Sequence, residues 1–552
     1  MGNLPSAGAT KVLPVDSLFN LPAPLPSWPP LLSDNNGGGF GSGSINLGGL
    51  EVQQISTFTK VWRILDGGPG NQGVTFFEPS PIPDGYFMLG SYVQQNNKPL
   101  FGWVLVGKDI DNSGTLKTPV DYTLVWSSEK STIKKDGNGY IWLPVAPEGY
   151  RSVGHVVTKS SAKPSLDKIR CVRSDLTESC ERSDLLFGAG GINAYGLRPT
   201  NRATQSLSVS VGTFVAEIDG GQSSTAAMSC LKNKDSNLSC MPNLSQIQAL
   251  VQTYSPWIYF HPKEQYLPSS VSWYFNNGAL LYKKGDESNP APIDSTGSNL
   301  PQGGWNDDTY WLDLPIDKDA KERVKKGDLG SSESYIHVKP MLGGTFTDLV
   351  FWFFYPFNGP GTAKVELINI PLGKIGEHIG DWEHLTLRIS NFSEKLWSAY
   401  FSQHSKGSWV NASDLEFQGG NKFVTYSALH GHPFYAKPGL VLQGNASLGI
   451  GIRNDTAKSD FVMNTGERYA VVSAEYLGTT IVEPPWLDYL KKWGPKIDYN
   501  TKDELDKIEK LLPGKLKDVF KRVINGLPRE VFGEDGPTGP KMKDYWTGDE
   551  RV

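Results

Sequence analysis

The sequence predicts a mainly β protein, with an N-terminal threefold β-prism-like domain followed by a β-sandwich-like domain that carries a few short helices. Three observations favour this fold class. The 552 residues contain 60 Gly and 38 Pro beside 16 Trp, 22 Tyr and 24 Phe, a composition typical of short strands joined by turns. The first half contains an internal repeat. The second half contains short strand patterns at the spacing of an antiparallel sandwich.

The repeat has three copies. Residues 83–93 (Pro-Asp-Gly-Tyr-Phe-Met-Leu-Gly-Ser-Tyr-Val) align with residues 147–157 (Pro-Glu-Gly-Tyr-Arg-Ser-Val-Gly-His-Val-Val), and residues 211–215 form a weaker third copy. A similar strand follows each copy, at 104–109, 170–175 and 229–233. One small sheet cannot bury its apolar face alone, whereas three can pack around a shared axis. The pattern therefore predicts a β-prism, with the central Gly of each copy at a bulge or a close backbone approach.

The composition changes along the chain and divides it into segments. We expect a flexible Pro- and Gly-rich arm at 1–45, the β-prism-like domain at 46–240, a linker helix at 241–253, the β-sandwich-like domain at 254–500, and a C-terminal helix with an extended tail at 501–552. The C-terminal helix has one apolar face, made of Leu516, Val519, Phe520, Val523 and Ile524.

The segment Gly-Asp-Trp-Glu-His at 380–384 contains the densest group of polar side chains. From Asp381 onward it has the pattern of a strand, so Asp381 and Glu383 share one face with Leu385 and Leu387. Leucines mark the face that turns inward, and buried charges are costly unless they are paired or bound to metal. A divalent cation held by Asp381, Glu383 and His378 is one solution.

Two other interpretations of these residues stay open. Asp381 and Glu383 could form a network of ion pairs with Arg388 and the histidines, or they could be exposed at the end of a strand. Further histidines that could contribute to the same site are His384, His404, His430 and His432.

Enzyme signatures are mostly absent. The sequence has no Gly-x-Ser-x-Gly elbow, no phosphate-binding loop and no His-Glu-x-x-His motif. Asp381 and Glu383 could work as an acid and base pair, but we assign no catalytic residue and favour a protein that is not an enzyme.

Charge and hydropathy narrow the range of partners. The net charge of -5 gives no reason to expect nucleic acid, and no apolar stretch approaches the ~18 residues of a membrane span. No secretory signal is evident, so we expect a cytoplasmic protein. Gly2 and Ser6 fit a myristoylation pattern, which would give a peripheral membrane association. The cysteines at 171, 180, 230 and 240 are expected to be thiols in a reducing compartment.

Several motifs together resemble one known family. They include Tyr254-Ser-Pro-Trp-Ile-Tyr-Phe-His-Pro, Gly376-Glu-His-Ile-Gly-Asp-Trp-Glu-His and Gly536-Pro-Thr-Gly-Pro-Lys. With these motifs the chain resembles the plant vacuolar protein sorting-associated protein 62 family over essentially its whole length. Many members of that family begin Met-Gly-Asn-Cys, whereas position 4 here is Leu, so the resemblance does not extend to a second acylation site.

Asp381, Trp382 and Glu383 also resemble the Gly-His-Arg-His-Asp-Trp-Glu motif of necrosis-inducing, plant-cytolytic toxins. That resemblance implies a divalent cation in a lectin-like β-sandwich that engages membrane glycolipid. A β-prism joined to a β-sandwich is similar to the receptor-binding part of bacterial three-domain insecticidal toxins, by architecture alone.

These observations lead to a functional hypothesis with two alternatives. We expect a peripheral, cation-dependent protein that binds membrane lipid or glycan in membrane traffic or defence. The first alternative is a membrane-damaging defence protein of a pore-forming or insecticidal type. The second is a metal-dependent hydrolase that uses Asp381, Glu383 and the histidines.

Overall fold

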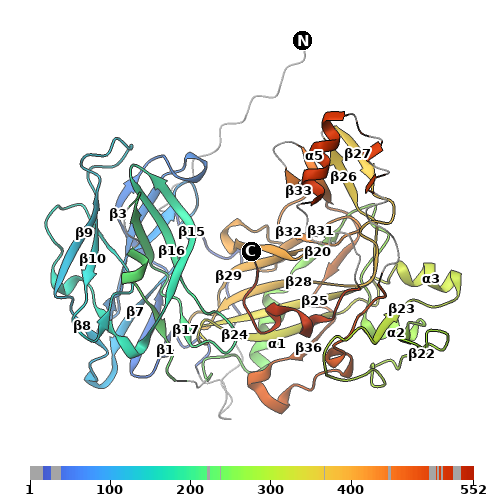
Figure 1. Ribbon diagram of the computed structural model, residues 1–552. Coiled ribbons are helices and arrows are strands. Elements are labelled where there is room, and N and C mark those ends of the chain that lie inside the picture. The colour runs from blue at the N-terminus through green and yellow to red at the C-terminus, as the bar shows by residue number, and fades with distance from the viewer. Residues whose placement is uncertain are drawn as a thin grey trace.

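The structure is a computed structural model that describes residues 17–26, 39–220, 224–235, 238–365, 367–445, 449–496, 505–506, 509–510, 512, 514–525 and 536–551. The predicted fold class is confirmed at the level of a mainly β protein built from many small antiparallel sheets. Figure 1 shows the N-terminal strands as one body and the strands that follow α1 as a second body beside it. Gly2, the predicted acylation site, lies outside the described residues.

The N-terminal body, which we call the repeat region, consists of three- and four-stranded antiparallel sheets. In spatial order, two of these sheets contain β1 (Ser44–Asn46), β2 (Leu50–Ile55), β7 (Val104–Asp109) and β5 (Phe87–Met88), and β3 (Phe58–Ile64), β4 (Val74–Pro79) and β6 (Tyr92–Gln95). Two more contain β12 (Val156–Thr158), β10 (Tyr140–Val145) and β9 (Asp121–Ser127), and β11 (Tyr150–Arg151), β13 (Cys171–Arg173) and β8 (Leu116–Lys117). The last two contain β14 (Thr177–Glu178), β19 (Cys230–Lys232) and β17 (Ser208–Val209), and β15 (Cys180–Ala189), β16 (Ile192–Pro199) and β18 (Phe214–Ile218).

Equivalent backbone hydrogen bonds link the three copies of the repeat into a closed ring. In each bond, a residue of one copy donates to the carbonyl of another copy. The donors and acceptors are Arg170 to Met88 at 3.1 Å, Ser229 to Ser152 at 3.0 Å, and Leu105 to Val211 at 2.9 Å. Each copy therefore completes its hydrogen bonding through a neighbour, as expected of a repeat that is not stable alone.

The backbones of the copies approach closely at the centre of this ring. A Cβ atom added to Gly154 would lie 2.8 Å from the Cα of Gly90 and 2.8 Å from the Cγ2 of Thr213. Gly90 and Gly154 are the central glycines of their copies, but the third copy places Thr213 at this point instead of Gly212. The hydroxyl of Thr213 donates to the carbonyl of Val153 at 2.6 Å, so the larger side chain is accommodated by a hydrogen bond.

The second body is built on a six-stranded sheet, which we call the central sheet. Its strands, in spatial order, are β30 (Lys406–Asn411), β29 (Leu396–Gln403), β28 (His378–Ser390), β25 (Phe346–Asn358), β24 (Ser334–Met341) and β36 (Tyr469–Ser473). Every residue of β25 is buried, which agrees with the apolar run predicted to form a central strand. Since successive side chains alternate, β25 contributes to a separate hydrophobic cluster on each face of the sheet.

One face of the central sheet packs against helix α1 (Leu244–Tyr254) and a four-stranded sheet. Asn243 caps α1 through a capping box with Gln246, and Phe351 and Phe353 of β25 lie in this core with Leu385 and Leu387 of β28. The second sheet contains β32 (Phe434–Tyr435), β31 (Val424–Ser427), β20 (Trp257–Phe260) and β35 (Val462–Asn464).

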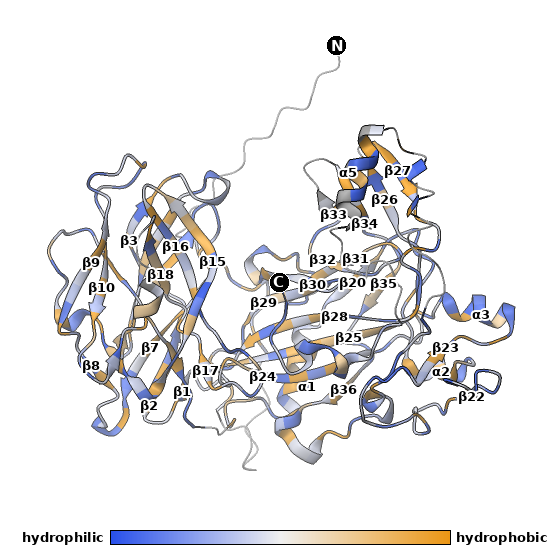
Figure 2. Cartoon of the chain, viewed as in Figure 1, coloured by the Kyte–Doolittle hydropathy of each residue, from blue (hydrophilic) through white to orange (hydrophobic). Residues whose placement is uncertain are grey.

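The other face carries an aromatic cluster with Trp352, Phe354 and Trp382 at its centre. Helix α2 (Val271–Asn276) contributes Tyr274 and Phe275 to it. Beyond it lie β21 (Leu280–Lys283), β22 (Ala291–Pro292), β23 (Tyr310–Asp313) and helix α3 (Lys318–Lys325). Figure 2 shows α3 as mostly hydrophilic, which fits a helix at the edge of the molecule.

Helix α5 (Gly514–Asn525) confirms a helix in the predicted C-terminal position. Its Phe520 is buried against Ile450, Ile452 and the partner strands of a further sheet. That sheet contains β27 (Ile368–Pro371), β26 (Thr362–Val365), β34 (Ile450–Thr456) and β33 (Gly439–Asn445). Val519, Val523 and Ile524 of the predicted apolar face have side chains outside the described residues.

Residues 17–26 of the predicted arm lie between the two bodies. Phe19 donates to the carbonyl of Leu100 in the repeat region at 3.1 Å, and the backbone N–H of Ala23 donates to the side chain of Asn421 at 2.9 Å. Cys171, Cys180, Cys230 and Cys240 are free thiols. None of the helices in the described part of the chain is long and apolar enough to cross a membrane.

Candidate carboxylate and histidine site

Asp381 and Glu383 lie on the face of β28 that turns toward the α1 core, as the alternation predicted. In the register with β25, Asp381 is opposite Tyr355 and Glu383 is opposite Phe353. The exposed fraction is 8% for Asp381 and 7% for Glu383. Two carboxyl groups are therefore buried next to each other at one end of a core strand, where each needs a compensating partner.

Gly380 sets the path of the strand into this site. Its φ of 67° is one that residues with a side chain rarely adopt. A Cβ atom here would also lie 2.4 Å from the carbonyl oxygen of Trp493. The Gly before Asp-Trp-Glu is thus required both by the backbone conformation and by the close approach of a neighbouring segment.

Asp381 contacts two imidazoles. Its Oδ2 is 3.0 Å from Nδ1 of His432, and its Oδ1 is 4.0 Å from Nε2 of His378. The ring of His432 stacks on Tyr355 with centroids 3.9 Å apart, and its Nε2 is 2.9 Å from the carbonyl oxygen of Tyr266. Burial alone would raise the pKa of Asp381, but the hydrogen bond from His432, together with weaker attraction from nearby charges, outweighs burial and lowers that pKa.

The protonation of His378 follows from its contacts. Its Nδ1 is 3.1 Å from the carbonyl oxygen of Gly380, and a carbonyl only accepts, so Nδ1 carries the proton. Burial lowers the pKa of His378, which favours the neutral ring. The lone pair is then on Nε2, the atom that faces Asp381.

Glu383 differs from Asp381 in the direction of its pKa shift. Burial, reinforced by the charge of Asp381, raises the pKa of Glu383 well above its usual range, which favours the protonated carboxyl group over the carboxylate. The hydroxyl of Ser402 on the neighbouring strand β29 hydrogen-bonds to its Oε2. A carboxyl group with a lowered pKa and one with a raised pKa therefore lie side by side.

The remaining predicted histidines occupy different surroundings. His384 lies on the opposite face of β28, with Nε2 3.0 Å from Glu550. His430 donates its backbone N–H to Glu264 at 2.7 Å, and its ring lies with His404 in the lining of a small pocket beside Gly359 and Gly431. Of the four additional histidines, His432 is the one that contacts Asp381.

Arg388 was predicted to pair with Asp381 and Glu383, but in the structure it pairs with other carboxylates. Arg388 pairs with Asp348 and Asp549 on the other face of β28, each at 2.7 Å, because alternation directs its side chain away from Asp381 and Glu383. Tyr266, Tyr355 and Ser402 were not among the predicted site residues. They meet Asp381, Glu383 and His432 through strand register and tertiary folding, for which the local sequence carries no signal.

The donor atoms have the chemistry that a divalent cation needs. Two ligands about 2.1 Å from one ion lie at most about 4.2 Å apart, and Nε2 of His378 and Oδ1 of Asp381 are separated by 4.0 Å. Among the residues that the structure describes, no group of three or more His, Cys, Asp or Glu side chains is arranged to hold a metal ion. Tetrahedral ligands at that bond length lie ~3.4 Å apart, so these two atoms would have to move closer to share a cation, and a third protein ligand would require Glu383 to turn toward them.

The fold and the site together define a mainly β protein with a buried carboxylate and imidazole cluster on its central sheet. Residues 15–550 match the family profile described as vacuolar protein sorting-associated protein 62. The chain belongs to the vacuolar protein sorting-associated protein 62 family. No curated protein matches the chain.

Among solved structures, the matches described next cover parts of the chain, each with a TM-score below 0.5. GNIP1Aa from Chromobacterium piscinae is 20% identical over 38% of this chain and 40% of that chain, with a TM-score of 0.28; the match thus spans less than half of GNIP1Aa. A structure described as a toxin fold for microbial attack and plant defense is 12% identical over 35% of this chain and 69% of its own, with a TM-score of 0.20. Necrosis and ethylene inducing protein 2 from the causal agent of cocoa's witches' broom disease is 13% identical over 42% of this chain and 75% of its own, with a TM-score of 0.19.

Proposed function

We propose that this protein binds a membrane lipid or glycan peripherally, through a divalent cation held at Asp381. One observation carries the proposal: the lone pair on Nε2 of neutral His378 faces the ionised Asp381 carboxylate at 4.0 Å, within the span of two ligands on one ion. Nitrogen and oxygen donors together suit manganese, zinc or iron. The sorting-associated description of the family supports a role at membranes.

The residues of the site have distinct roles in this proposal. His378 and Asp381 would hold the cation, and Glu383 would join them once deprotonated. His432 orients Asp381, because it bonds to both that carboxylate and the carbonyl of Tyr266. The bound cation would supply positive charge for the oxygen atoms of a lipid headgroup or a sugar. A finer fold assignment is also part of the proposal: the closed ring of repeats supports a β-prism, and the paired sheets around α1 support a β-sandwich.

Metal content and cation affinity test the proposal. We compare the wild type with Asp381→Asn and His378→Gln, using plasma mass spectrometry of purified protein and calorimetric titration with Mn²⁺, Zn²⁺ and Ca²⁺. Each substitution should weaken cation affinity at least about tenfold, since each removes a donor. The matched control is Glu377→Gln, which removes a carboxylate next to His378 without touching Asp381. Equal affinities in all four proteins would exclude this site.

Binding to membranes is measured separately. Wild-type protein is sedimented with phosphatidylcholine vesicles that contain either phosphatidylserine or glucosylceramide, with and without the cation found above. Binding that needs the cation and is lost in Asp381→Asn supports the proposal. Binding that a chelator leaves unchanged would separate membrane association from the Asp381 site, and release of a trapped dye would favour the membrane-damaging alternative.

A second candidate, a metal-dependent hydrolase, is favoured by one specific observation. Glu383 has a raised pKa and Asp381 a lowered one, and neighbouring carboxyl groups whose pKa values diverge are typical of an acid and base pair. Nitrophenyl esters, phosphates and glycosides are the substrates to test. Turnover by the wild type that Glu383→Gln abolishes would favour the hydrolase, and the absence of turnover would leave binding as the function.

A further inference from the structure

The segment Gly536–Arg551 covers the face of the central sheet opposite to Asp381 and Glu383. It contains short 3-10 turns at Pro540–Met542 and Asp544–Trp546. Trp546 stacks on His337 of β24 with centroids 3.7 Å apart, and Tyr545 stacks on His384 of β28 at 4.7 Å. The segment therefore lies on the sheet as a peptide lies in a groove, with two aromatic side chains as anchors.

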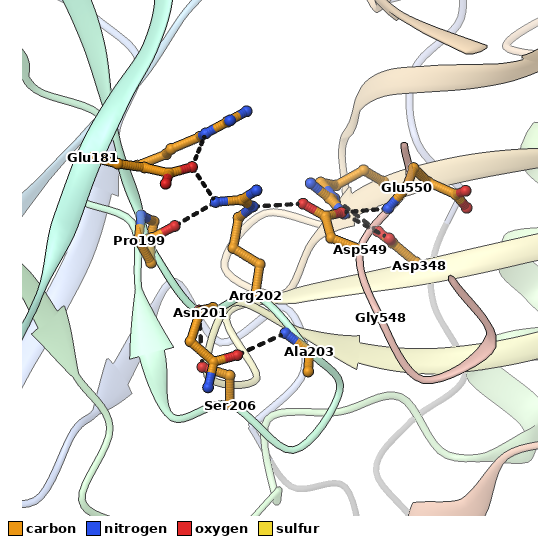
Figure 3. A network of polar contacts seen from close by, with 12 residues as sticks. Glu181, Pro199, Asn201, Arg202, Ala203, Ser206, Asp348, Gly548, Asp549 and Glu550 are labelled. Carbon is orange, nitrogen blue, oxygen red and sulfur yellow. Dashed lines mark hydrogen bonds and ion pairs between the residues drawn. The ribbon is translucent and has the colours of Figure 1, made fainter. Parts of the chain in front are cut away.

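Beyond these anchors, the acids of the segment meet cations from both bodies of the protein. Figure 3 shows Asp549 between Arg202 of the repeat region and the central sheet. Asp549 is 2.9 Å from Arg202 Nε and 2.7 Å from Arg388 NH2. Glu550 is 3.0 Å from Nε2 of His384 and also accepts a hydrogen bond from Thr386.

A lysine completes the cationic set under the segment. Lys339 has no exposed surface, and its Nζ donates to the carbonyl oxygens of Tyr545 and Gly548 at 2.9 and 3.1 Å. Asp348, paired with Arg388, and Glu181, 2.9 Å from Arg202, are the carboxylates present without the segment. Arg202, Arg388 and Lys339 outnumber these two carboxylates, and Asp549 and Glu550 offset that excess of positive charge.

This arrangement is that of an anion site filled by the protein's own chain. Removing one partner of a buried ion pair is costly, because it leaves the other charge uncompensated. An external anion that offers the same charges would replace Asp549 and Glu550 without leaving Arg202 and Arg388 uncompensated. Guanidinium groups at Arg202 and Arg388 suit planar or tetrahedral oxyanions, since they donate several parallel hydrogen bonds.

We propose that Arg202, Arg388, Lys339 and His384 form a second binding site, for anions carrying two or more phosphate or carboxylate groups, and that Gly536–Arg551 is its built-in competitor. The site is separate from Asp381, because it lies on the other face of β28. Its ligand would displace the segment and so break the contact that Asp549 makes between Arg202 of the repeat region and the central sheet. This inference does not depend on the cation proposed above.

The test uses the full chain at neutral pH. Hydrogen exchange of residues 544–551 is followed by mass spectrometry with inositol hexakisphosphate, with vesicles containing phosphatidic acid, and with vesicles of phosphatidylcholine alone. Either anionic probe should speed exchange in this segment roughly tenfold while leaving β25 unchanged. The soluble and vesicle arms distinguish a free polyphosphate from a lipid headgroup. No acceleration with either probe would overturn the proposal.

Variants test the competition directly. Asp549→Asn/Glu550→Gln weakens the competitor, so affinity for the effective probe should rise at least about tenfold. The control Asp286→Asn/Asp319→Asn changes the net charge equally at exposed positions outside the segment and should leave affinity unchanged. Arg202→Gln, which is partly exposed and less disruptive than a change at Arg388, should lower affinity. Equal gains in the two double variants would mean nonspecific attraction and would overturn the proposal.

Discussion

His155 in the repeat region illustrates how a single buried side chain makes stability depend on pH. Its Nδ1 is 3.3 Å from the carbonyl oxygen of Phe214, and no exposed surface remains. Burial lowers the pKa of His155 to about 4, although the hydrogen bond to Phe214 acts in the other direction. The unfolded chain takes up this proton near pH 6.5, so between those two values the unfolded state binds more protons and stability falls as the pH falls.

We predict that His155→Phe removes this dependence. Phe214 occupies the corresponding place in the third copy, so a phenyl ring suits the surroundings. Between pH 7.5 and 5.0 the unfolding free energy of the wild type should fall by about 2 kcal/mol more than that of the variant. Urea unfolding at the two pH values measures this difference. Parallel losses in both proteins would assign the pH dependence to other groups.

At the same scale, the sequence was sufficient for Asp381 and Glu383 but not for their partners. The alternation with Leu385 and Leu387 placed both carboxyl groups on the inward face, where they are found. The hydrogen bond from His432 lowers the pKa of Asp381, and the one from Ser402 opposes the rise in the pKa of Glu383. Ser402 comes from β29 and His432 from the loop between β31 and β32. No local sequence pattern predicts that these residues contact Asp381 and Glu383.

Among the elements, the three repeat copies depend on a close backbone approach. A Cβ at Gly154 would come within 2.8 Å of Gly90 Cα and 3.0 Å of the Leu89 carbonyl oxygen. Gly154→Ala should therefore lower the unfolding free energy by about 1–3 kcal/mol through overpacking. Thermal or urea unfolding measures this effect.

Gly149→Ala is the matched control for this prediction. Gly149 has φ of 79° but open space around its Cβ position, so its substitution carries a conformational cost of about 1 kcal/mol and no steric one. A smaller effect at Gly154 than at Gly149 would mean that the copies can move apart to accept a methyl group.

Periodicity explains which elements could be predicted. The apolar run of β25, the capped helix α1 and the helix α5 each carry a local pattern, and each was predicted at the right place. The third repeat copy was predicted with Gly212 at its centre, whereas Thr213 lies there. At this position the hydrogen bond from Thr213 to Val153 accommodates a side chain where the other copies have glycine. Sequence alignment does not reveal that a threonine can occupy the position of a glycine in this way.

For the whole molecule, Asp549 is one of the residues that join the two bodies, because it pairs with both Arg202 and Arg388. Burial raises its pKa, but the charges of Arg388 and Arg202 outweigh burial and lower that pKa to about 2. A carboxyl group whose pKa is lowered by folding adds stability above its unfolded pKa near 3.9 and loses it as the pH falls toward 2.

Asp549→Asn should therefore reduce the unfolding free energy by about 2 kcal/mol at pH 7, with the difference shrinking below about pH 4. Urea unfolding at pH 7 and pH 3 measures both values. Asp544→Asn is the control, because Asp544 is largely exposed. A difference that persists unchanged at pH 3 would show that the effect comes from packing and not from the charge of Asp549.

The sequence did not predict the path of the C-terminal segment that joins the two β regions. The residues after Pro528 were expected to be extended because they are rich in Gly and Pro. Instead, Tyr545, Trp546 and Asp549 are integrated into the interior. Two aromatic residues followed by two acids gave no periodic signal, and their partners lie far away in the chain.

The ring formed by the repeat copies also has a consequence for biosynthesis. Because Leu105 donates to Val211, the first copy cannot complete its hydrogen bonding until the third copy has left the ribosome. Contacts so distant in sequence form slowly, and the Leu105 end of β7, beyond its pairing with β5, lacks this hydrogen bond during that delay. A pause in translation before Val211 would therefore hold the nascent chain in an aggregation-prone state, whereas a pause after Lys232 would allow the ring to close.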